Sequence, residues 1–129
     1  MTIPGLGTVQ AFGLTVPMVT ERMPVRRLSA YVFDDPVITA RVIVPGLRAS
    51  ADLLVCISHC GLSEDRRLAE AVPGIDVIVG GHTHATLPEG EIVGSTRIVH
   101  AASHAQAYGQ VVVRGARGAR QTEARLFPL

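Results

Sequence analysis

Three histidines stand out as the residues whose type and position could do chemistry. His59 comes directly after an apolar run, and His82 and His84 follow a second apolar run and a pair of glycines. Neutral imidazole is a good ligand for divalent transition-metal ions, although a single histidine is more often an ordinary loop residue. Three histidines placed after two such runs predict a metal site, with His59, His82 and His84 as its ligands.

The two apolar runs have the pattern of neighbouring parallel strands. Residues 52–58 form a continuous apolar run, which is typical of a strand buried on both faces. Residues 63–71 predict a helix that Ser63 caps, and residues 76–79 predict the next strand. A strand, a helix and a strand at this spacing indicate a βαβ unit. Because ligands bind beyond the carboxyl ends of parallel strands, we expect the three histidines at one edge of the sheet.

The residues around the second pair of histidines would let their side chains come close to His59. Gly80 and Gly81 have no side chains, which lets the backbone turn tightly beside the site. An extended backbone across residues 82–84 would send both imidazoles of that segment to the same side. His59 could then face them from the neighbouring strand.

The first part of the chain predicts one strand, a long loop and a helix. Residues 8–15 are β-branched and apolar, and predict a strand. Residues 17–34 contain prolines and no clean period, which indicates a loop with at most a short strand near 31–33. Asp34-Asp35-Pro36 is typical of a helix start, whereas Pro45-Gly46 weakens the second half of that helix.

The last part of the chain predicts short strands joined by glycine-rich turns. Residues 97–100, 110–114 and 121–127 have strand patterns, and residues 115–120 predict a hairpin turn. No helix pattern is evident among them, so we expect antiparallel additions to the sheet. The predicted fold class is therefore α/β, with the parallel βαβ unit extended by antiparallel strands near 96–127.

The bulk composition suits a single domain with an aliphatic core. The chain has 129 residues, of which 47% are apolar. Its net charge of +1 gives no reason to expect nucleic acid or an anionic membrane as a partner. No apolar stretch reaches the roughly 18 residues that span a membrane, and the N-terminus lacks signal-peptide features, so a cytoplasmic location is expected. Cys56 and Cys60 are expected to be reduced thiols.

Two segments resemble the calcineurin-like metallophosphoesterases. They are residues 55–61, Val-Cys-Ile-Ser-His-Cys-Gly, and residues 74–84, Gly-Ile-Asp-Val-Ile-Val-Gly-Gly-His-Thr-His. Within that superfamily they look most like the 5′-nucleotidase and 2′,3′-cyclic phosphodiesterase branch. The resemblance implies part of a metallophosphoesterase sandwich and a two-metal hydrolase, in which His59 and His82 bind one divalent ion and His84 binds the other. The ion stays open among Mn, Zn, Fe, Co and Mg. Two such ions would activate a bridging hydroxide against a phosphate ester or nucleotide substrate.

The sequence also departs from the pattern of that family. The family's Asp-x-His, Gly-Asp and Gly-Asn-His motifs supply carboxylate and amide ligands. This chain has no Asn, no Asp followed two residues later by His, and no Gly-Asp. We therefore expect residues 1–129 to be a single domain that corresponds to the C-terminal half of the catalytic domain, without the N-terminal half or the nucleotide-specificity domain. Such a chain is expected to be inactive alone, and we assign it no catalytic residue.

Two other interpretations stay open. The chain could be a non-catalytic remnant that holds one metal ion, or that pairs with another chain or with itself through its incomplete sheet. It could also be a single-metal hydrolase assembled across a homodimer. Missing first strands would leave apolar surface exposed on the sheet.

The remaining polar residues are expected to lie in solvated or surface positions and in a turn. His100 and His104 lie near a strand end and are expected to be solvated loop histidines. Residues 64–67 are expected to form a solvated helix face, and the Arg-Arg pair at 26–27 to lie at the surface. Tyr108-Gly109 is expected to close a turn.

Overall fold

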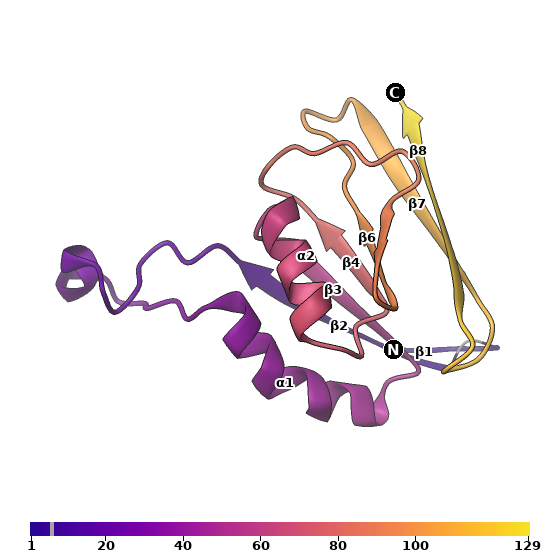
Figure 1. Ribbon diagram of the computed structural model, residues 1–129, viewed down its shortest axis with the longest axis horizontal. Helices are drawn as coiled ribbons and strands as arrows, with labels where there is room; N and C mark the ends of the chain where they lie inside the picture. Colours follow the sequence, from indigo (N-terminus) through magenta and orange to yellow (C-terminus); the bar gives the residue numbers. More distant parts are fainter. Residues whose placement is uncertain (6) are drawn as a thin grey trace.

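The fold centres on a six-stranded sheet flanked by two helices and a separate hairpin (Figure 1). The computed structural model describes residues 1–5 and 7–129. The strands of the main sheet are Thr2–Ile3 (β1), Gly7–Thr15 (β2), Leu53–His59 (β3), Val77–Gly80 (β4), Glu91–Val93 (β5) and Thr96–Val99 (β6). Their order is β1-β2-β3-β4-β6-β5, with β2, β3, β4 and β6 parallel and with β1 and β5 antiparallel at the edges.

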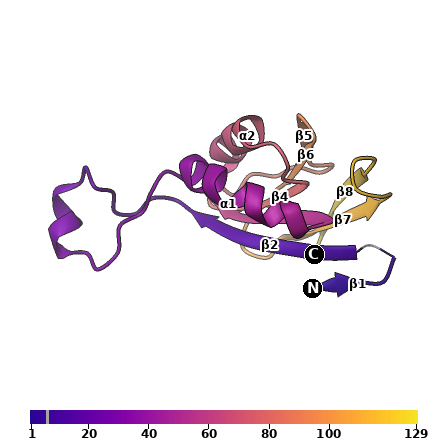
Figure 2. The same cartoon turned by 90° about the horizontal axis from the view of Figure 1, so that it is seen from below.

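Both helices cover the same face of this sheet (Figure 2). α1 spans Pro36–Ser50 and α2 spans Leu62–Ala71. Side chains alternate between the two faces of a strand, so every second residue of the central strands faces the helices. The core is formed by these strand residues together with buried residues of the helices: Leu54, Cys56, Ile78, Ile98, Val44 and Leu68.

The start of α1 is fixed by Asp35, as the sequence predicted. The Asp35 carboxylate accepts hydrogen bonds from the backbone N–H groups of Val37 at 2.8 Å and Ile38 at 3.1 Å. It also accepts one from Arg67 Nη2 at 2.7 Å. The Arg67 guanidinium, together with these N–H groups, holds the pKa of Asp35 below its usual value.

Replacing Asp35 by alanine should lower the free energy of unfolding by about 1 kcal/mol, the usual loss for an N-cap side chain. Because its pKa is lowered in the folded state, this contribution is present above the unfolded pKa of about 3.9 and fades as the pH falls through the folded value. Urea unfolding at neutral and strongly acidic pH measures the difference. Asp34→Ala, one residue outside the cap, is the control. Equal stability of the Asp35 variant at neutral pH would contradict the capping role.

The second half of α1 is intact, and the predicted weakening at Pro45-Gly46 was wrong. The helix continues to Ser50 because its inner side, which includes Val44, is buried in the core. Pro45-Gly46 is exposed, so water can replace the helix hydrogen bond that proline cannot make. In the last turn Arg48 Nη1 donates to Asp76 Oδ2 at 2.5 Å, which ties the helix end to the segment before β4.

The last two strands form a sheet of their own. β7 (Ala107–Arg114) and β8 (Gln121–Pro128) pair antiparallel around the predicted hairpin turn. The predicted fold class is confirmed in outline, with two corrections. Thr96–Val99 runs parallel to β4, because β5 first reverses the chain, and the hairpin does not extend the main sheet. Tyr108-Gly109 lies inside β7 rather than in a turn, because Tyr108 stacks on its cross-strand partner Phe127 with ring centres 5.0 Å apart.

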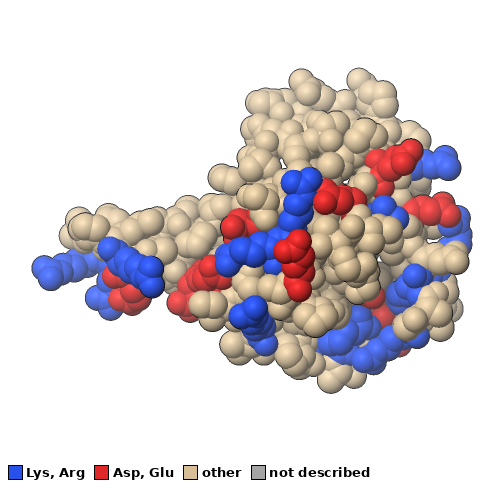
Figure 3. Space-filling view, viewed as in Figure 1, with Lys and Arg blue, Asp and Glu red and all other residues tan. Residues whose placement is uncertain are grey.

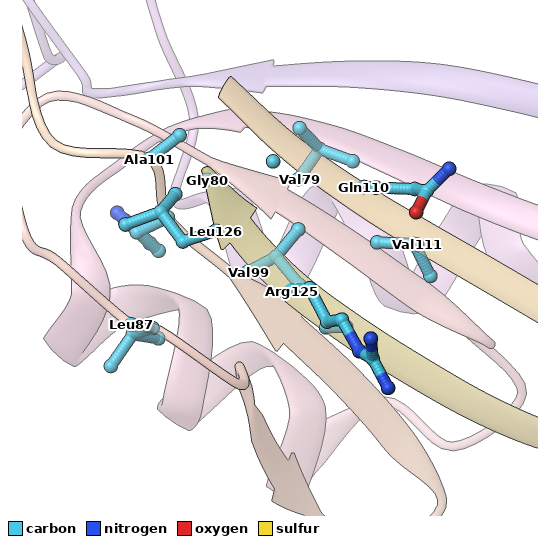
Figure 4. Close-up of a pocket in the computed structure, with 12 residues that line it drawn as sticks. Val79, Gly80, Leu87, Val99, Ala101, Gln110, Val111, Arg125 and Leu126 are labelled. Carbon is cyan, nitrogen blue, oxygen red and sulfur yellow. The ribbon is translucent and has the colours of Figure 1, made fainter. Parts of the chain in front are cut away.

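A cavity of about 290 Å³ separates the hairpin from the main sheet (Figure 4). Its walls are mostly apolar side chains of β4, β6, β7 and β8, such as Val79 and Leu126. Hydrogen bonds near both ends of β8 hold the hairpin beside the sheet. Leu126 N donates to Pro88 O at 2.9 Å, and Arg97 Nη2 donates to Thr122 O at 2.5 Å. The hairpin is therefore anchored at its ends but leaves a void against β4 and β6.

The sheet face opposite the helices opens toward the carboxyl ends of its strands. On β3, Leu53 is 6% exposed and Ile57 is 58% exposed. On β4, Val77 is 3% exposed and Val79 is 43% exposed. The predicted burial on both faces thus holds only for the first half of β3. Within residues 1–5 and 7–129, the outer edge of β2 also has no partner strand beyond Val9. Apolar surface and a free strand edge are exposed, as the sequence predicted.

Residues 16–35 leave the sheet as an extended arm, seen at the left of Figures 1 and 2. The arm contains a 3₁₀ helix at Pro24–Leu28. Residues 31–33 form no strand, which agrees with the prediction of a loop with at most a short strand there. Arg26 pairs with Glu21 at the surface, as expected for the two arginines. Across the described residues, no helix has the length and apolarity needed to cross a membrane.

Candidate metal centre

The carboxyl edge of the parallel sheet carries the three predicted ligands. His59 is the last residue of β3, and His82 and His84 lie in the loop that leaves β4. The rings of His59 and His82 meet edge to face, with their centres 5.1 Å apart. Both residues are exposed, so solvent and dissolved ions can reach them. The parallel pairing of β3 with β4 accounts for this convergence.

His84 belongs to a second pair. Its ring lies against that of His104, with centres 5.6 Å apart and planes at 74°. His104 is exposed, as predicted for a loop histidine, but its contact with His84 was not predicted. Within residues 1–5 and 7–129, no three His, Cys, Asp or Glu side chains lie close enough together to hold one ion. The edge therefore carries two imidazole pairs rather than one trio.

The backbone of the histidine loop is tightly turned, and the predicted extended form was wrong. His82 has a φ of 74° and His84 a φ of 56°, both in the left-handed region that non-glycine residues rarely adopt. Thr83 N donates to Gly81 O at 3.0 Å, because the chain reverses direction directly after the strand. His104 is also left-handed, with a φ of 57°. Residues held in this conformation cluster at functional sites.

Thr83, between the two histidines, ties this loop to helix α2. Its Oγ1 accepts a hydrogen bond from Leu62 N at 3.2 Å. The helix begins at Leu62 with Gly61 as its N-cap, so the predicted cap at Ser63 was wrong. Gly61 has a φ of 92°, and a Cβ there would lie 2.7 Å from Thr83 Cγ2. Only glycine meets both demands, and the histidine loop is held against the helix end as a result.

A buried polar network, which the sequence patterns did not predict, lies beneath the histidine edge. Ser58 Oγ donates to Asp65 Oδ1 at 2.5 Å, and His100 Nε2 lies 2.7 Å from Asp65 Oδ2. Asp65 is 0% exposed and His100 is 3% exposed. The expectations of a solvated face at Asp65 and of a solvated loop at His100 were therefore wrong. A Cβ on Gly80 would collide with both side chains, so this glycine makes room for them.

The sequence did contain a signal for this network. Asp65 lies one turn before Leu68 on the buried stripe of α2. His100 lies two residues after Ile98, on the buried side of β6. Polar residues at positions where a pattern requires apolar ones are the informative exceptions. Both patterns place a polar residue on a buried face, which signals a buried polar contact without naming its partner.

The other charged residues of α2 are solvated, as predicted. Arg66 Nη2 donates to Glu91 Oε2 at 2.7 Å, and Arg67 Nη2 donates to Glu64 Oε2 at 2.6 Å. The hydrogen bonds from Arg66 lower the pKa of Glu91. Pairs this exposed contribute little to stability.

Both cysteines are free thiols, as predicted, and both are buried. Burial raises the pKa of Cys56 to about 12 and also raises the pKa of Cys60. Both thiols are buried, so neither is exposed beside the histidines.

The four exposed imidazoles fit part of a metal centre. Two imidazoles that share one ion at ordinary metal–nitrogen distances have ring centres roughly 5 Å apart. The observed separations of 5.1 Å and 5.6 Å agree with that geometry. Residues 77–88 and 98–113 contain no Asp, Glu, Lys or Arg, and the upper lobe in Figure 3 is correspondingly free of red and blue. The loops of this edge thus offer imidazoles without a carboxylate that could bridge two ions.

Three comparisons with known proteins bear on this edge. No family model matches the chain. The chain is 30% identical over 106 residues to the uncharacterised metallophosphoesterase YunD of Bacillus subtilis, a match that covers 82% of this chain and 22% of YunD. It superposes on the sulfate thiohydrolase SoxB of Thermus thermophilus with a TM-score of 0.76, at 29% identity. It also superposes on a 5′-nucleotidase precursor from Thermus thermophilus with a TM-score of 0.65, at 28% identity.

The chain matches only part of each of these proteins. Both superpositions cover 93% of this chain, but 22% of SoxB and 28% of the 5′-nucleotidase precursor. Nearly all of the described fold is therefore found within larger proteins that contain further structure.

Proposed function

Since the homologues of this chain are metallophosphoesterases and 5′-nucleotidases, we propose that it forms one part of a two-metal phosphoester hydrolase. The observation that carries this proposal is the pairing of exposed imidazoles at the carboxyl edge of the sheet. His59 and His82 hold one divalent ion, and His84 holds the other, with Mn, Zn, Fe, Co or Mg as the metal. Bound ions of this kind polarise phosphate oxygens and supply hydroxide at neutral pH.

The chain's own residues hold the ligands in place. The parallel register of β3 and β4 sets His59 against His82. The hydrogen bond from Leu62 N to Thr83 Oγ1 keeps the histidine loop on the end of α2. Below the loop, Asp65 links Ser58 at the end of β3 to the residue that follows β6, so the strand ends cannot separate easily. Ligands fixed by such supporting contacts bind metal better than mobile ones.

We also propose that the isolated chain is inactive. A bridged pair of ions needs carboxylate ligands, and this sequence contains none of the family's Asp-x-His, Gly-Asp or Gly-Asn-His motifs. The exposed apolar face at Ile57 and Val79 lies beside the histidine edge, which suits packing of the rest of a catalytic domain there. Residues 1–129 are then one domain, the C-terminal half of that catalytic domain. A phosphate ester or nucleotide binds only to the completed site.

A hybrid enzyme tests this function. This chain replaces the matching segment of the Thermus 5′-nucleotidase, and the hybrid and the isolated chain are assayed with a nucleotide, an aryl phosphate and a sulfur-bound sulfate compound. We expect metal-dependent phosphate hydrolysis by the hybrid and none by the isolated chain. His82→Ala in the hybrid should lower the rate by about 100-fold or more. Arg114→Ala, at an exposed ion pair of the hairpin, is the control.

Two results would contradict the proposal. Hydrolysis by the isolated chain would show that it is complete, and a folded, metal-loaded hybrid that cleaves neither phosphate ester would exclude the reaction. Cleavage of the sulfate compound alone would favour the reaction for which SoxB is named. Because a hybrid can fail to fold, zinc titration of the isolated chain provides a second test. His59 and His82 must both respond to the metal.

A second candidate function is that of a protein-binding remnant that pairs with itself or with another chain. The observation in its favour is the open face at Ile57 and Val79 together with the free edge of β2. Analytical ultracentrifugation decides whether the chain dimerises, and Ile57→Asp should disrupt such a dimer. A strictly monomeric chain would exclude self-pairing. Restored hydrolysis in a mixture of His59→Ala and His84→Ala chains would instead indicate a hydrolase assembled across two copies.

A further inference from the structure

We propose that His104 is a metal ligand, and that His84 and His104 together hold the second ion at this edge. The inference rests on the proposed function for the presence of the ions. It adds a ligand that the sequence motifs do not contain, because His104 lies 20 residues after His84 on a different loop.

The four exposed imidazoles are divided into two pairs. His82 faces His59, which leaves His84 without a second imidazole from the predicted trio. His104 fills that place, edge to face with His84 at 5.6 Å between ring centres. The separation resembles the 5.1 Å of the first pair and agrees with two ligands of one ion. Each ion then receives two imidazoles from this chain.

The two loops that carry His84 and His104 are joined to each other by backbone pairing. Ala102 N donates to Ala85 O at 2.9 Å, and Leu87 N donates to His100 O at 3.2 Å. Between these bonds, Thr86 and Ala101 form an antiparallel bridge. The contact between the two histidine side chains is therefore set by backbone pairing on both loops.

The His104 ring is oriented by its neighbour Ser103. Its Nδ1 lies 2.8 Å from Ser103 Oγ, within hydrogen-bonding distance. A metal-binding histidine usually has one ring nitrogen held by a hydrogen bond while the other binds the ion. Here Nε2 is the nitrogen left for the metal. Among the described residues, neither His84 nor His104 pairs with a carboxylate that would compete for the ring.

Zinc titration followed by nuclear magnetic resonance of the histidine ring nitrogens tests this inference on the intact chain. The chain has five histidines, so each can be resolved and assigned. We expect His84 and His104 to shift together, with one dissociation constant, and His59 and His82 to shift as a second pair. His100 is buried against Asp65 and should not move, which makes it an internal control.

Substitutions test whether His104 binds the metal or only lies close to His84. His84→Asn should abolish the zinc-dependent shift of His104 and leave His59 and His82 responsive. Asparagine is chosen because it tolerates the left-handed backbone at this position. His104→Asn should weaken zinc binding at His84 by at least about 100-fold, since losing only a hydrogen-bond partner of a ligand weakens metal binding about 10–100-fold. Ser103→Ala, which removes such a partner, should weaken binding by roughly 10-fold.

The outcomes distinguish this inference from the proposed function. A static His104 while zinc shifts His59, His82 and His84 would overturn the inference alone. So would a His104 shift that persists in the His84→Asn chain. If zinc shifts none of the four exposed histidines, the metal site and this inference both fall.

Discussion

An Asp65→Ala variant should lose about 3–5 kcal/mol of unfolding free energy, because two buried polar groups lose their common hydrogen-bond partner. The Asp65 carboxylate is 0% exposed and serves both Ser58 Oγ and His100 Nε2. Alanine leaves both groups buried without their partner, and each such orphan costs about 1–3 kcal/mol. It also leaves a cavity in the core. Urea unfolding measures the loss directly, and thermal unfolding should show a fall on the order of 10 °C.

Two control variants test whether the loss of stability comes from the buried contacts of Asp65 with Ser58 and His100. Asp65→Asn keeps the shape of the side chain and can still accept one hydrogen bond, so an intermediate loss is expected. Glu64→Ala removes a neighbouring carboxylate that pairs with Arg67 at the surface, and should change stability by less than about 1 kcal/mol. If Asp65→Ala proved as stable as Glu64→Ala, the buried network would not form in solution.

The βαβ unit was predictable because its signals are local. The apolar run of β3, the acidic first turn of α2 and the Pro73-Gly74 stop before β4 each depend only on neighbouring residues. Parallel pairing then follows from the helix between the strands, and with it the common edge for His59 and His82. The end of the strands at which the histidines lie could therefore be predicted without knowing any contact between residues far apart in the chain.

The contacts that the sequence did not predict are those between residues far apart in the chain. Asp65 pairs with His100, 35 positions later, and His84 meets His104 through two loops joined by backbone bonds. Periodicity gives the face on which a residue lies, and not the partner that it meets there. The parallel direction of β6 was missed for the same reason, since it depends on the reversal of the chain at the short strand β5.

A Gly80→Ala variant should lose about 3 kcal/mol of unfolding free energy, at the upper end of the range for overpacked cores. The strain does not come from backbone conformation. A Cβ on Gly80 would overlap both His100 Nε2 and Asp65 Oδ2, so the methyl group and the hydrogen bond between these atoms compete for the same space. Unfolding in urea measures the loss, and the buried His100 ring resonance should move in the variant. Unchanged stability would mean that the network lies elsewhere.

Gly81→Ala is the matched control, because it adds the same methyl group one residue later. Its Cβ would lie 3.3 Å from His59 Nδ1, and no closer atom stands in its way. This variant should therefore fold with nearly unchanged stability but displace the His59 ring, weakening zinc binding at the His59 and His82 pair. The two glycines thus separate two demands at one turn. Gly80 makes room for the buried support, and Gly81 makes room for a candidate ligand.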